Sequence, residues 1–102
     1  MGTLNELFDP DRVAVVGATA REGAVGRAVT SNLLDDFAGD TVPVNPNYDE
    51  VLGTPCVDDV ADADADVAVV VVPPSIVLDA IEACGEAGVR NVVVITAGFG
   101  ET

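Results

Sequence analysis

Short apolar runs rich in valine recur along the chain. Runs of this length and composition predict strands that are buried within a sheet. The runs cover residues 12–16, 41–45, 66–72 and 91–96. The run 66–72 is almost entirely apolar, which predicts a central strand covered on both faces. Pro43 has no backbone N–H and therefore places the run 41–45 at an edge of the sheet.

Two stretches between these strands repeat their apolar residues at helical spacing. Residues 24–37 predict a helix that ends at Gly39, and residues 76–87 predict a second helix with Ser75 as its N-cap and Gly88 after its last turn. The side chains expected to face the core are Val25, Ala28, Val29, Leu33, Leu34 and Phe37 in the first helix, and Val77, Ala80, Ile81 and Cys84 in the second.

The segment 48–65 has no clear period. Gly53-Thr54-Pro55 predicts a turn, and residues 57–61 predict one or two helical turns. Aspartates are frequent here, but their spacing lacks the glycine and the terminal Glu of a calcium loop. A solvated acidic face is therefore favoured over a metal site. These aspartates are Asp58, Asp59, Asp62, Asp64 and Asp66.

Strands that alternate with helices predict an α/β fold in which right-handed crossovers join parallel strands. We expect a Rossmann-like sheet with helices on both faces and the four predicted strands in the order 2-1-3-4. In that order, ligands collect beyond the carboxyl ends of strands 1 and 3, which are Gly17 and the segment 72–75. No predicted helix follows the fourth strand. Residues 1–102 are therefore expected to be one domain, truncated after strand 4, from the N-terminal part of a longer protein.

The charge of the chain is strongly negative. The 18 acidic residues are set against four arginines, without any lysine or histidine, and the formal net charge is -14. Such a surface repels nucleic acid and anionic membranes, so neither is expected as a partner. The composition resembles that of halophilic proteins from salt-loving archaea, in which high ionic strength screens the repulsion between carboxylates. An ordinary acidic protein is the alternative.

No feature of the sequence directs the chain to a membrane or to export. The first eleven residues are polar and acidic and do not resemble a signal peptide. The longest apolar run, residues 67–72, is far shorter than the roughly 20 residues of a membrane span, and a cytoplasmic location is expected. Cys56 and Cys84 suggest neither a zinc site nor a disulfide framework. Cys84 is expected in the core.

The segment VAVVGATAREGAVG, residues 13–26, runs from a buried strand through a glycine-rich loop into a helix. The backbone N–H groups of such a loop and the positive end of the helix dipole converge on one point, which is typical of a phosphate-binding site. The spacing of Gly17, Gly23 and Gly26 is G-x5-G-x2-G, which differs from the dinucleotide pattern G-x-G-x-x-G. Thr19 stands where that pattern has its second glycine.

Two further features bear on the ligand of this loop. The second strand ends at Asn45-Pro46 and lacks the acidic residue that holds the ribose of NAD. An NAD(P)-dependent oxidoreductase domain is therefore disfavoured. Arg21 is one of only four cations and is the side chain best suited to a diphosphate, through bidentate hydrogen bonds. The alternatives are a solvated Arg21 paired with Glu22, and a loop that is only a structural turn.

Five short motifs together resemble one family over nearly all of the chain. They are Leu7-Phe8-Asp9-Pro10, Arg12-Val13-Ala14-Val15-Val16-Gly17-Ala18-Thr19, Pro43-Val44-Asn45-Pro46, Val71-Val72-Pro73-Pro74 and Ile95-Thr96-Ala97-Gly98-Phe99. In this order and spacing they resemble the CoA-binding N-terminal domain of ADP-forming acetyl-CoA synthetase (acetate-CoA ligase). They are similar also to the alpha subunit of succinyl-CoA synthetase.

The resemblance implies a binding site for coenzyme A. The segment from Thr19 to Gly26 would wrap the diphosphate, and residues 72–75 and 95–97 would line the path of the nucleotide and the pantetheine arm. Two adjacent prolines also make a stiff apolar wall. The cofactor-binding candidates are Gly17, Thr19, Arg21, Gly23, Val25, Gly26, Asn45, Pro46, Val72, Pro73, Pro74, Ser75, Ile95, Thr96 and Ala97.

The same resemblance implies an acid-CoA ligase that makes acyl-CoA from an organic acid, CoA and ATP through an acyl phosphate and a phosphorylated histidine. This chain has no histidine. We therefore expect the ATP-grasp portion, with ATP/ADP and Mg, on another domain or subunit, and CoA binding without turnover here. A stand-alone CoA-binding regulatory module is the alternative. Relatives often carry a lysine shortly after Pro46, whereas Asn47 and Tyr48 follow it here.

Overall fold

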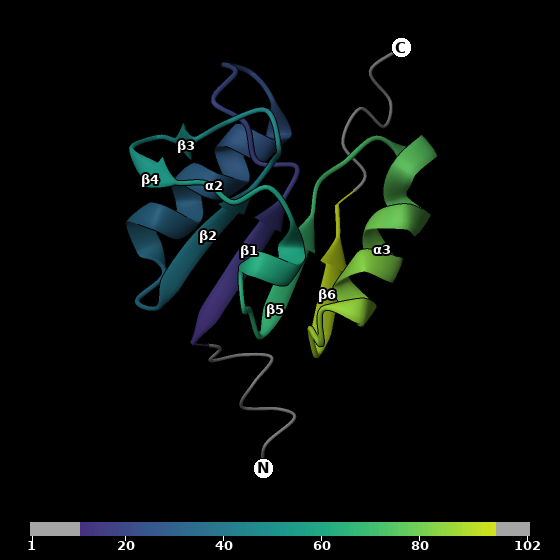
Figure 1. Ribbon diagram of the computed structural model, residues 1–102. Coiled ribbons are helices and arrows are strands. Elements are labelled where there is room, and N and C mark those ends of the chain that lie inside the picture. Colours follow the sequence, from purple (N-terminus) through teal and green to yellow (C-terminus); the bar gives the residue numbers. More distant parts are fainter. Residues whose placement is uncertain (1–10, 96–102) are drawn as a thin grey trace.

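The computed structural model describes residues 11–95, which form an α/β fold around a four-stranded parallel sheet (Figure 1). The strands are β1 (Arg12–Val16), β2 (Asp40–Val44), β5 (Val67–Val70) and β6 (Asn91–Val94), and their spatial order is β2-β1-β5-β6. This is the order 2-1-3-4 expected from the sequence. In the register, Val13 lies beside Thr41 on one side and beside Val67 on the other. β2, which carries Pro43, lies at an edge of the sheet, as predicted.

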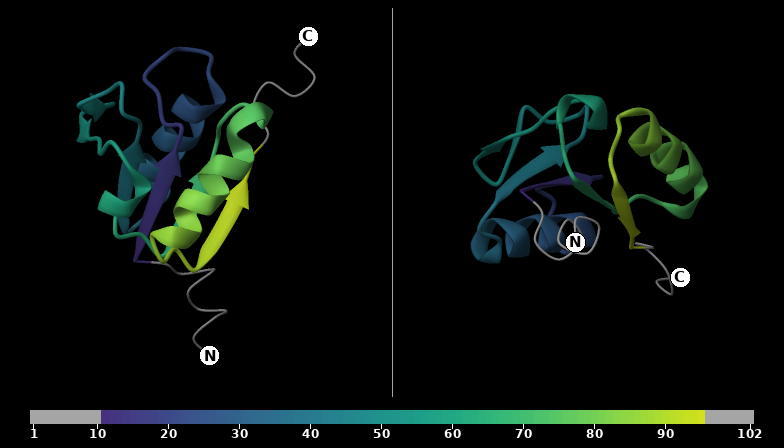
Figure 2. Two further views of the ribbon diagram at one scale, coloured as in Figure 1. Left: turned by 45° about the vertical axis from the view of Figure 1, so that its right-hand side comes forward. Right: turned by 90° about the horizontal axis from the view of Figure 1, so that it is seen from below.

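Two helices cover opposite faces of the sheet, α2 (Val25–Asp36) and α3 (Val77–Glu86). The views of Figure 2 place α2 beside β1 and β2, and α3 beside β5 and β6. Successive residues of a strand point to opposite faces, so Val15 packs with Val25, Val29 and Leu33 of α2. Its neighbour Ala14 lies in the cluster that α3 covers. The expectation of helices on both faces is confirmed.

The sequence predicted the C-terminal end of α3 correctly and its N-terminal end incorrectly. Gly88 has a φ of 82° and accommodates the C-terminal turn, in which the Val89 N–H donates to the Cys84 carbonyl. The expected Ser75 cap is wrong. Pro74–Ile76 form a 3-10 turn (η2) and Ile76 precedes the helix without a side-chain cap, because the two prolines carry the chain past Ser75 before the helix starts.

The segment that lacked a clear period contains a small hairpin and a 3-10 turn. The hairpin pairs β3 (Glu50–Val51) with β4 (Thr54–Pro55), and the turn η1 covers Val60–Asp62. Leu52 and Gly53 have φ angles of 53° and 81°, the left-handed backbone of a two-residue hairpin turn. The predicted turn and helical turn are thus present, each displaced by a few residues.

Some apolar side chains remain on the surface. Leu78 is 76% exposed, and Ile81, which was expected in the inward stripe of the second helix, is 37% exposed. The stripe that packs on the sheet is Val77, Ala80, Ala83, Cys84 and Ala87, so the helix is rotated away from Ile81. Val93 and Val94 of β6 are also exposed, at the sheet edge opposite β2.

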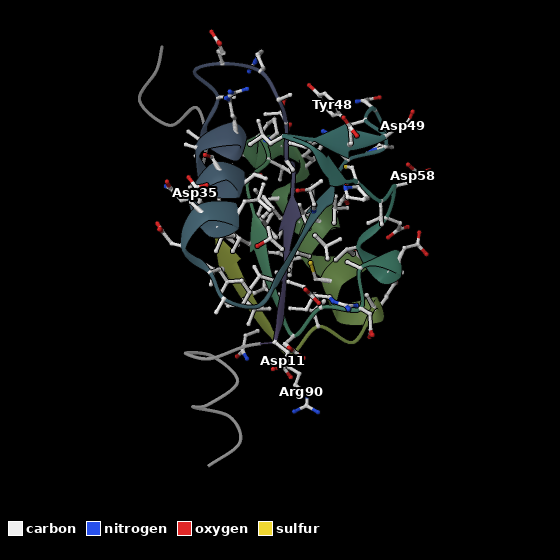
Figure 3. The ribbon with its side chains drawn as sticks, turned by 90° about the vertical axis from the view of Figure 1, so that its left-hand side faces the viewer. Asp11, Asp35, Tyr48, Asp49, Asp58 and Arg90 are labelled. Carbon is white, nitrogen blue, oxygen red and sulfur yellow. The ribbon has the colours of Figure 1, made fainter. Side chains whose placement is uncertain are left out.

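The amino ends of the strands are tied together by charged groups. The Asp66 carboxylate accepts hydrogen bonds from the backbone N–H groups of Asp11 and Arg12, and the Arg12 guanidinium lies 3.3 Å from the Asp40 carboxylate. Figure 3 shows Asp11 and Arg90 at this end, far from Tyr48 at the other. None of the helices in the described part is long and apolar enough to cross a membrane.

Candidate functional site

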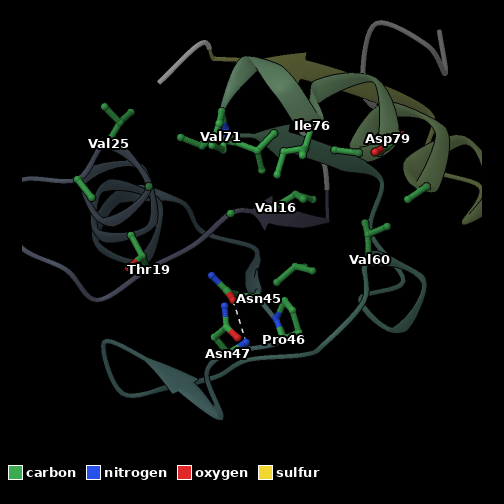
Figure 4. Close-up of a pocket in the computed structure, with 18 of the residues that line it drawn as sticks. Val16, Thr19, Val25, Asn45, Pro46, Asn47, Val60, Val71, Ile76 and Asp79 are labelled. Carbon is green, nitrogen blue, oxygen red and sulfur yellow. Dashed lines mark hydrogen bonds between the residues drawn. The ribbon is translucent and has the colours of Figure 1, made fainter. Parts of the chain in front are cut away.

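A pocket of about 890 Å³ lies at the carboxyl edge of the sheet, between the start of α2 and the start of α3. Figure 4 shows Thr19 and Val25 on one side of it, Asp79 and Val60 on the other, and Asn45 and Pro46 below. Most of the residues predicted from the sequence line it. They are Gly17, Thr19, Arg21, Gly23, Val25, Gly26, Asn45, Pro46, Val72, Pro73 and Pro74.

Two predicted residues within the described part of the chain, Ser75 and Ile95, are not brought into this lining. Ser75 lies in the exposed 3-10 turn η2. Ile95 packs against the cluster that contains Val15, and its N–H donates to the Val70 carbonyl. Thr96 and Ala97 lie outside the described residues.

The opposite wall of the pocket was not foreseen. It consists of Asp58, Asp59 and Val60 around η1, and of Ile76, Asp79, Ala80 and Ala83 from α3 and the turn before it. In the second group, Asp79, Ala80 and Ala83 follow Ile76 by three, four and seven residues, which is the spacing of one face of a helix. This spacing could have predicted that the helix after the prolines lines the pocket. Asp58 and Asp59 lie in the segment without a period, which gave no comparable signal.

Close backbone contacts explain two glycines of the loop. A Cβ on Gly17, whose φ is 98°, would collide with the Val71 carbonyl, and a Cβ on Gly26 would lie 2.5 Å from the Gly17 carbonyl oxygen. These glycines therefore let β1, β5 and the first turn of α2 meet directly. Gly23 is different, because a Cβ there would meet nothing within 4 Å and only its φ of 85° favours glycine.

The N-terminus of α2 opens into the pocket without a side-chain cap. Ala24 occupies the N-cap position and makes no capping hydrogen bond, since alanine has no polar side-chain atom. The first backbone N–H groups of a helix have no carbonyl partner within it. Those of Val25 and Gly26, which line the pocket, are thus available to an anion at the positive end of the helix dipole.

Hydrogen bonds hold the loop against its neighbours. Asn45 Nδ2 donates to the Ala18 carbonyl at 2.8 Å, while Asn45 Oδ1 accepts from the Asn47 N–H at 2.9 Å. Asn45 was a cofactor-binding candidate from the sequence, and both polar atoms of its side-chain amide form hydrogen bonds within the protein. The Arg27 guanidinium donates to the Ala20 carbonyl at 2.6 Å and fixes the middle of the loop.

Charges of both signs border the pocket. Arg21 is the one cation among its described lining residues, and no hydrogen bond or ion pair joins its guanidinium to a residue that the structure describes, Glu22 included. Three acidic residues, Asp58, Asp59 and Asp79, line the opposite wall, and Figure 4 shows Asp79 there. An anionic ligand is therefore attracted to the glycine loop and repelled by that wall.

The cysteines do not add chemistry to the site. Burial, assisted by the nearby charges of Asp58 and Asp49 and opposed by a backbone hydrogen bond at Asn45, raises the pKa of the Cys56 thiol above its usual value. Burial also raises the pKa of Cys84, which lies in the core as expected. Both cysteines are free, and the described residues contain no group of three or more side chains suited to a metal ion.

Curated relatives resemble this chain over most of its length. It is 48% identical over 100 residues to an ADP-forming acetate–CoA ligase of Methanocaldococcus jannaschii, a match that covers 96% of this chain and 14% of the relative. It is 40% identical to the alpha subunit of ADP-forming acetate–CoA ligase II of Pyrococcus furiosus, over 97% of this chain and 22% of that subunit. The chain thus spans only a fraction of the length of these relatives.

A solved structure and a family model agree with these matches. The acetyl-coenzyme A synthetase 1 of Ca. Korarchaeum cryptofilum, in complex with phosphate and ADP, superimposes with a TM-score of 0.88 at 44% identity. This match covers 97% of the chain and 22% of that structure. The model described as CoA binding domain matches residues 11–101. With the glycine loop, the open helix N-terminus and the strand order in place, the chain belongs to the CoA binding domain family.

Proposed function

We propose that this chain binds coenzyme A in the pocket at the carboxyl edge of the sheet. The observation that carries the proposal is the open N-terminus of α2 beside a glycine loop that brings Arg21 to the same pocket. The loop and helix supply backbone donors, and the guanidinium supplies a planar pair of donors, which together suit a diphosphate.

The remaining lining suits the neutral parts of the same ligand. Val72, Pro73 and Pro74 form a wall without backbone N–H groups at the prolines, and Ile76 extends this apolar surface. A pocket with a mostly apolar lining and a few polar groups at one end is typical of cofactor sites of this volume. In the proposed complex the diphosphate lies at the glycine loop, and the less polar parts of CoA lie along the prolines.

We further propose that residues 1–102 act as one domain of an ADP-forming acyl-CoA synthetase. Acetate–CoA ligases are among the relatives, and some of them are named as alpha subunits. The chain contains no histidine, so a phosphorylated histidine, the ATP-grasp portion and its ATP and Mg would be supplied by another domain or subunit. The halophilic origin and the cytoplasmic location expected from the sequence stay predictions.

Calorimetric titration in high salt with CoA, dephospho-CoA and NAD tests the ligand. We expect CoA and dephospho-CoA to bind, because both carry the diphosphate and the pantetheine arm, and NAD, which has a diphosphate but no pantetheine arm, to bind more weakly. Binding of NAD with no response to CoA would contradict the proposal.

A pair of charge-matched variants tests the place of binding. Arg21→Gln removes the pocket cation and is expected to raise the Kd for CoA about tenfold, as the loss of a charge-assisted hydrogen bond does. Arg90→Gln makes the same change in net charge at the far end of the molecule (Figure 3) and is expected to leave the Kd nearly unchanged. Equal effects of both variants would mean that the guanidinium of Arg21 has no local role.

A further inference from the structure

The hydroxyl of Thr19 has two hydrogen-bond partners within the described part of the protein. The backbone N–H of Arg21 donates to Thr19 Oγ1 at 3.1 Å, and Tyr48 Oη lies 2.8 Å from the same atom. Thr19 lines the pocket, whereas Tyr48 is not among its lining residues. Any effect of the Tyr48 hydroxyl on a ligand in the pocket therefore passes through Thr19.

The number of lone pairs on a hydroxyl limits what Thr19 offers to a ligand. A hydroxyl oxygen accepts two hydrogen bonds and donates one. The Arg21 N–H fills one acceptor position of Oγ1. If the Tyr48 hydroxyl fills the second, the proton of Thr19 is left without an acceptor among the described residues and is free to donate into the pocket.

The position of Tyr48 is fixed by the turn between β2 and the hairpin and by the packing of its ring. The Tyr48 N–H donates to the Asn45 carbonyl at 3.3 Å, directly after strand β2. The Tyr48 side chain packs on the cluster of Val15, Ala18 and Val51, in which Val51 is fully buried. The phenol hydroxyl is thus held against the glycine loop by packing within the core of the protein.

We propose that Tyr48 is a positioning residue that donates to Thr19 and thereby makes the Thr19 hydroxyl a hydrogen-bond donor to the diphosphate of the ligand. The inference rests on the proposed function. Phosphate oxygens only accept hydrogen bonds, so an anion in the pocket favours this direction of the Tyr48–Thr19 bond over the reverse. The site thereby selects a ligand that has acceptor oxygens at the glycine loop.

A double-mutant cycle tests the coupling, with the Kd for CoA measured by calorimetry. Tyr48→Phe keeps the packing of the ring and removes its hydroxyl, and Thr19→Val keeps the shape and removes the donor. Each single variant is expected to raise the Kd about five- to tenfold. In the Thr19→Val background, Tyr48→Phe is expected to have no further effect, because the hydroxyl through which Tyr48 acts is absent. Additive effects would overturn the proposal.

Further variants and ligands separate positioning from general stability. Thr19→Ser keeps the hydroxyl and should retain the affinity for CoA, and Thr54→Val makes the matched change outside the pocket and should be neutral. If Tyr48→Phe does not fold, retained affinity in Thr19→Ser with loss in Thr19→Val supports the donor role of Thr19, and equal loss in both overturns it.

Dephospho-CoA identifies the phosphate concerned. It retains the diphosphate, so the effect of Thr19→Val should be as large for it as for CoA. An effect seen with CoA alone would overturn the assignment to the diphosphate. Failure of the unsubstituted chain to bind either ligand would instead contradict the proposed function.

Discussion

Thr41 in β2 is a buried polar residue whose Oγ1 has no hydrogen-bond partner among the described residues. A hydroxyl removed from water without a partner lowers stability by about 1–3 kcal/mol. Thr30, the other buried threonine in the described part of the chain, differs because its Oγ1 donates to the Gly26 carbonyl at 2.7 Å. The same residue type therefore has opposite energetic consequences at two positions.

Thr41→Val is expected to increase the free energy of unfolding by about 1 kcal/mol, since it removes an unpartnered hydroxyl and keeps the shape of a strand residue. Urea unfolding at fixed salt measures this change. Thr30→Val is the control, and it should not stabilise the protein because it removes a hydrogen bond. An equal gain in both variants would show that hydrophobicity alone accounts for the effect.

At the level of elements, the sequence predicted what depends on local pattern. Valine-rich runs and helical spacing predicted the strand order, because the alternation of strand and helix restricts the topology. The glycines between the first strand and the first helix predicted the loop. The side of α3 that faces the sheet depends on how the helix packs on β5 and β6, and Ile81 was misplaced for this reason. Asp58 and Asp59 reach the pocket only through tertiary folding of an aperiodic segment.

The two helical glycines offer a matched test of the contact between α2 and β1. Gly26→Ala places a Cβ 2.5 Å from the Gly17 carbonyl oxygen, so it is expected to lower the free energy of unfolding by about 1–3 kcal/mol and to weaken CoA binding. Gly85→Ala in α3 meets nothing within 4 Å, and it is expected to stabilise the helix by up to about 1 kcal/mol. Chemical unfolding and calorimetry measure both. Destabilisation by Gly85→Ala equal to that by Gly26→Ala would contradict the contact.

For the whole molecule, the formal net charge of -14 makes repulsion between carboxylates a property of the entire surface. The chain has only four arginines to reduce this repulsion, and one of them, Arg12, forms ion pairs with both Asp40 and Asp64. The last turn of α2 contains Asp35 and Asp36 and no basic residue, although the negative end of the helix dipole disfavours acidic residues there. Figure 3 shows Asp35 on the outside of this helix.

Molar KCl is therefore expected to raise the midpoint of thermal unfolding relative to dilute buffer, by at least about 5 °C, which corresponds to about 1 kcal/mol for a domain of this size. The double variant Asp35→Asn/Asp36→Asn should be more stable than the unsubstituted chain in dilute buffer and should gain less from KCl. Sucrose serves as the uncharged comparison. Coincident midpoints in dilute buffer and molar KCl would rule out a dominant role of charge repulsion.

The position of β1 between β2 and β5 also has a consequence for biosynthesis. β1 is the first strand of the described chain to leave the ribosome, yet its second neighbour, which begins at Val67, is made much later. Until then one edge of Val13–Val16 has no partner strand, and a valine-rich edge of this kind is prone to pair with other chains. Slow release of the nascent chain would therefore extend the period in which it is exposed to aggregation.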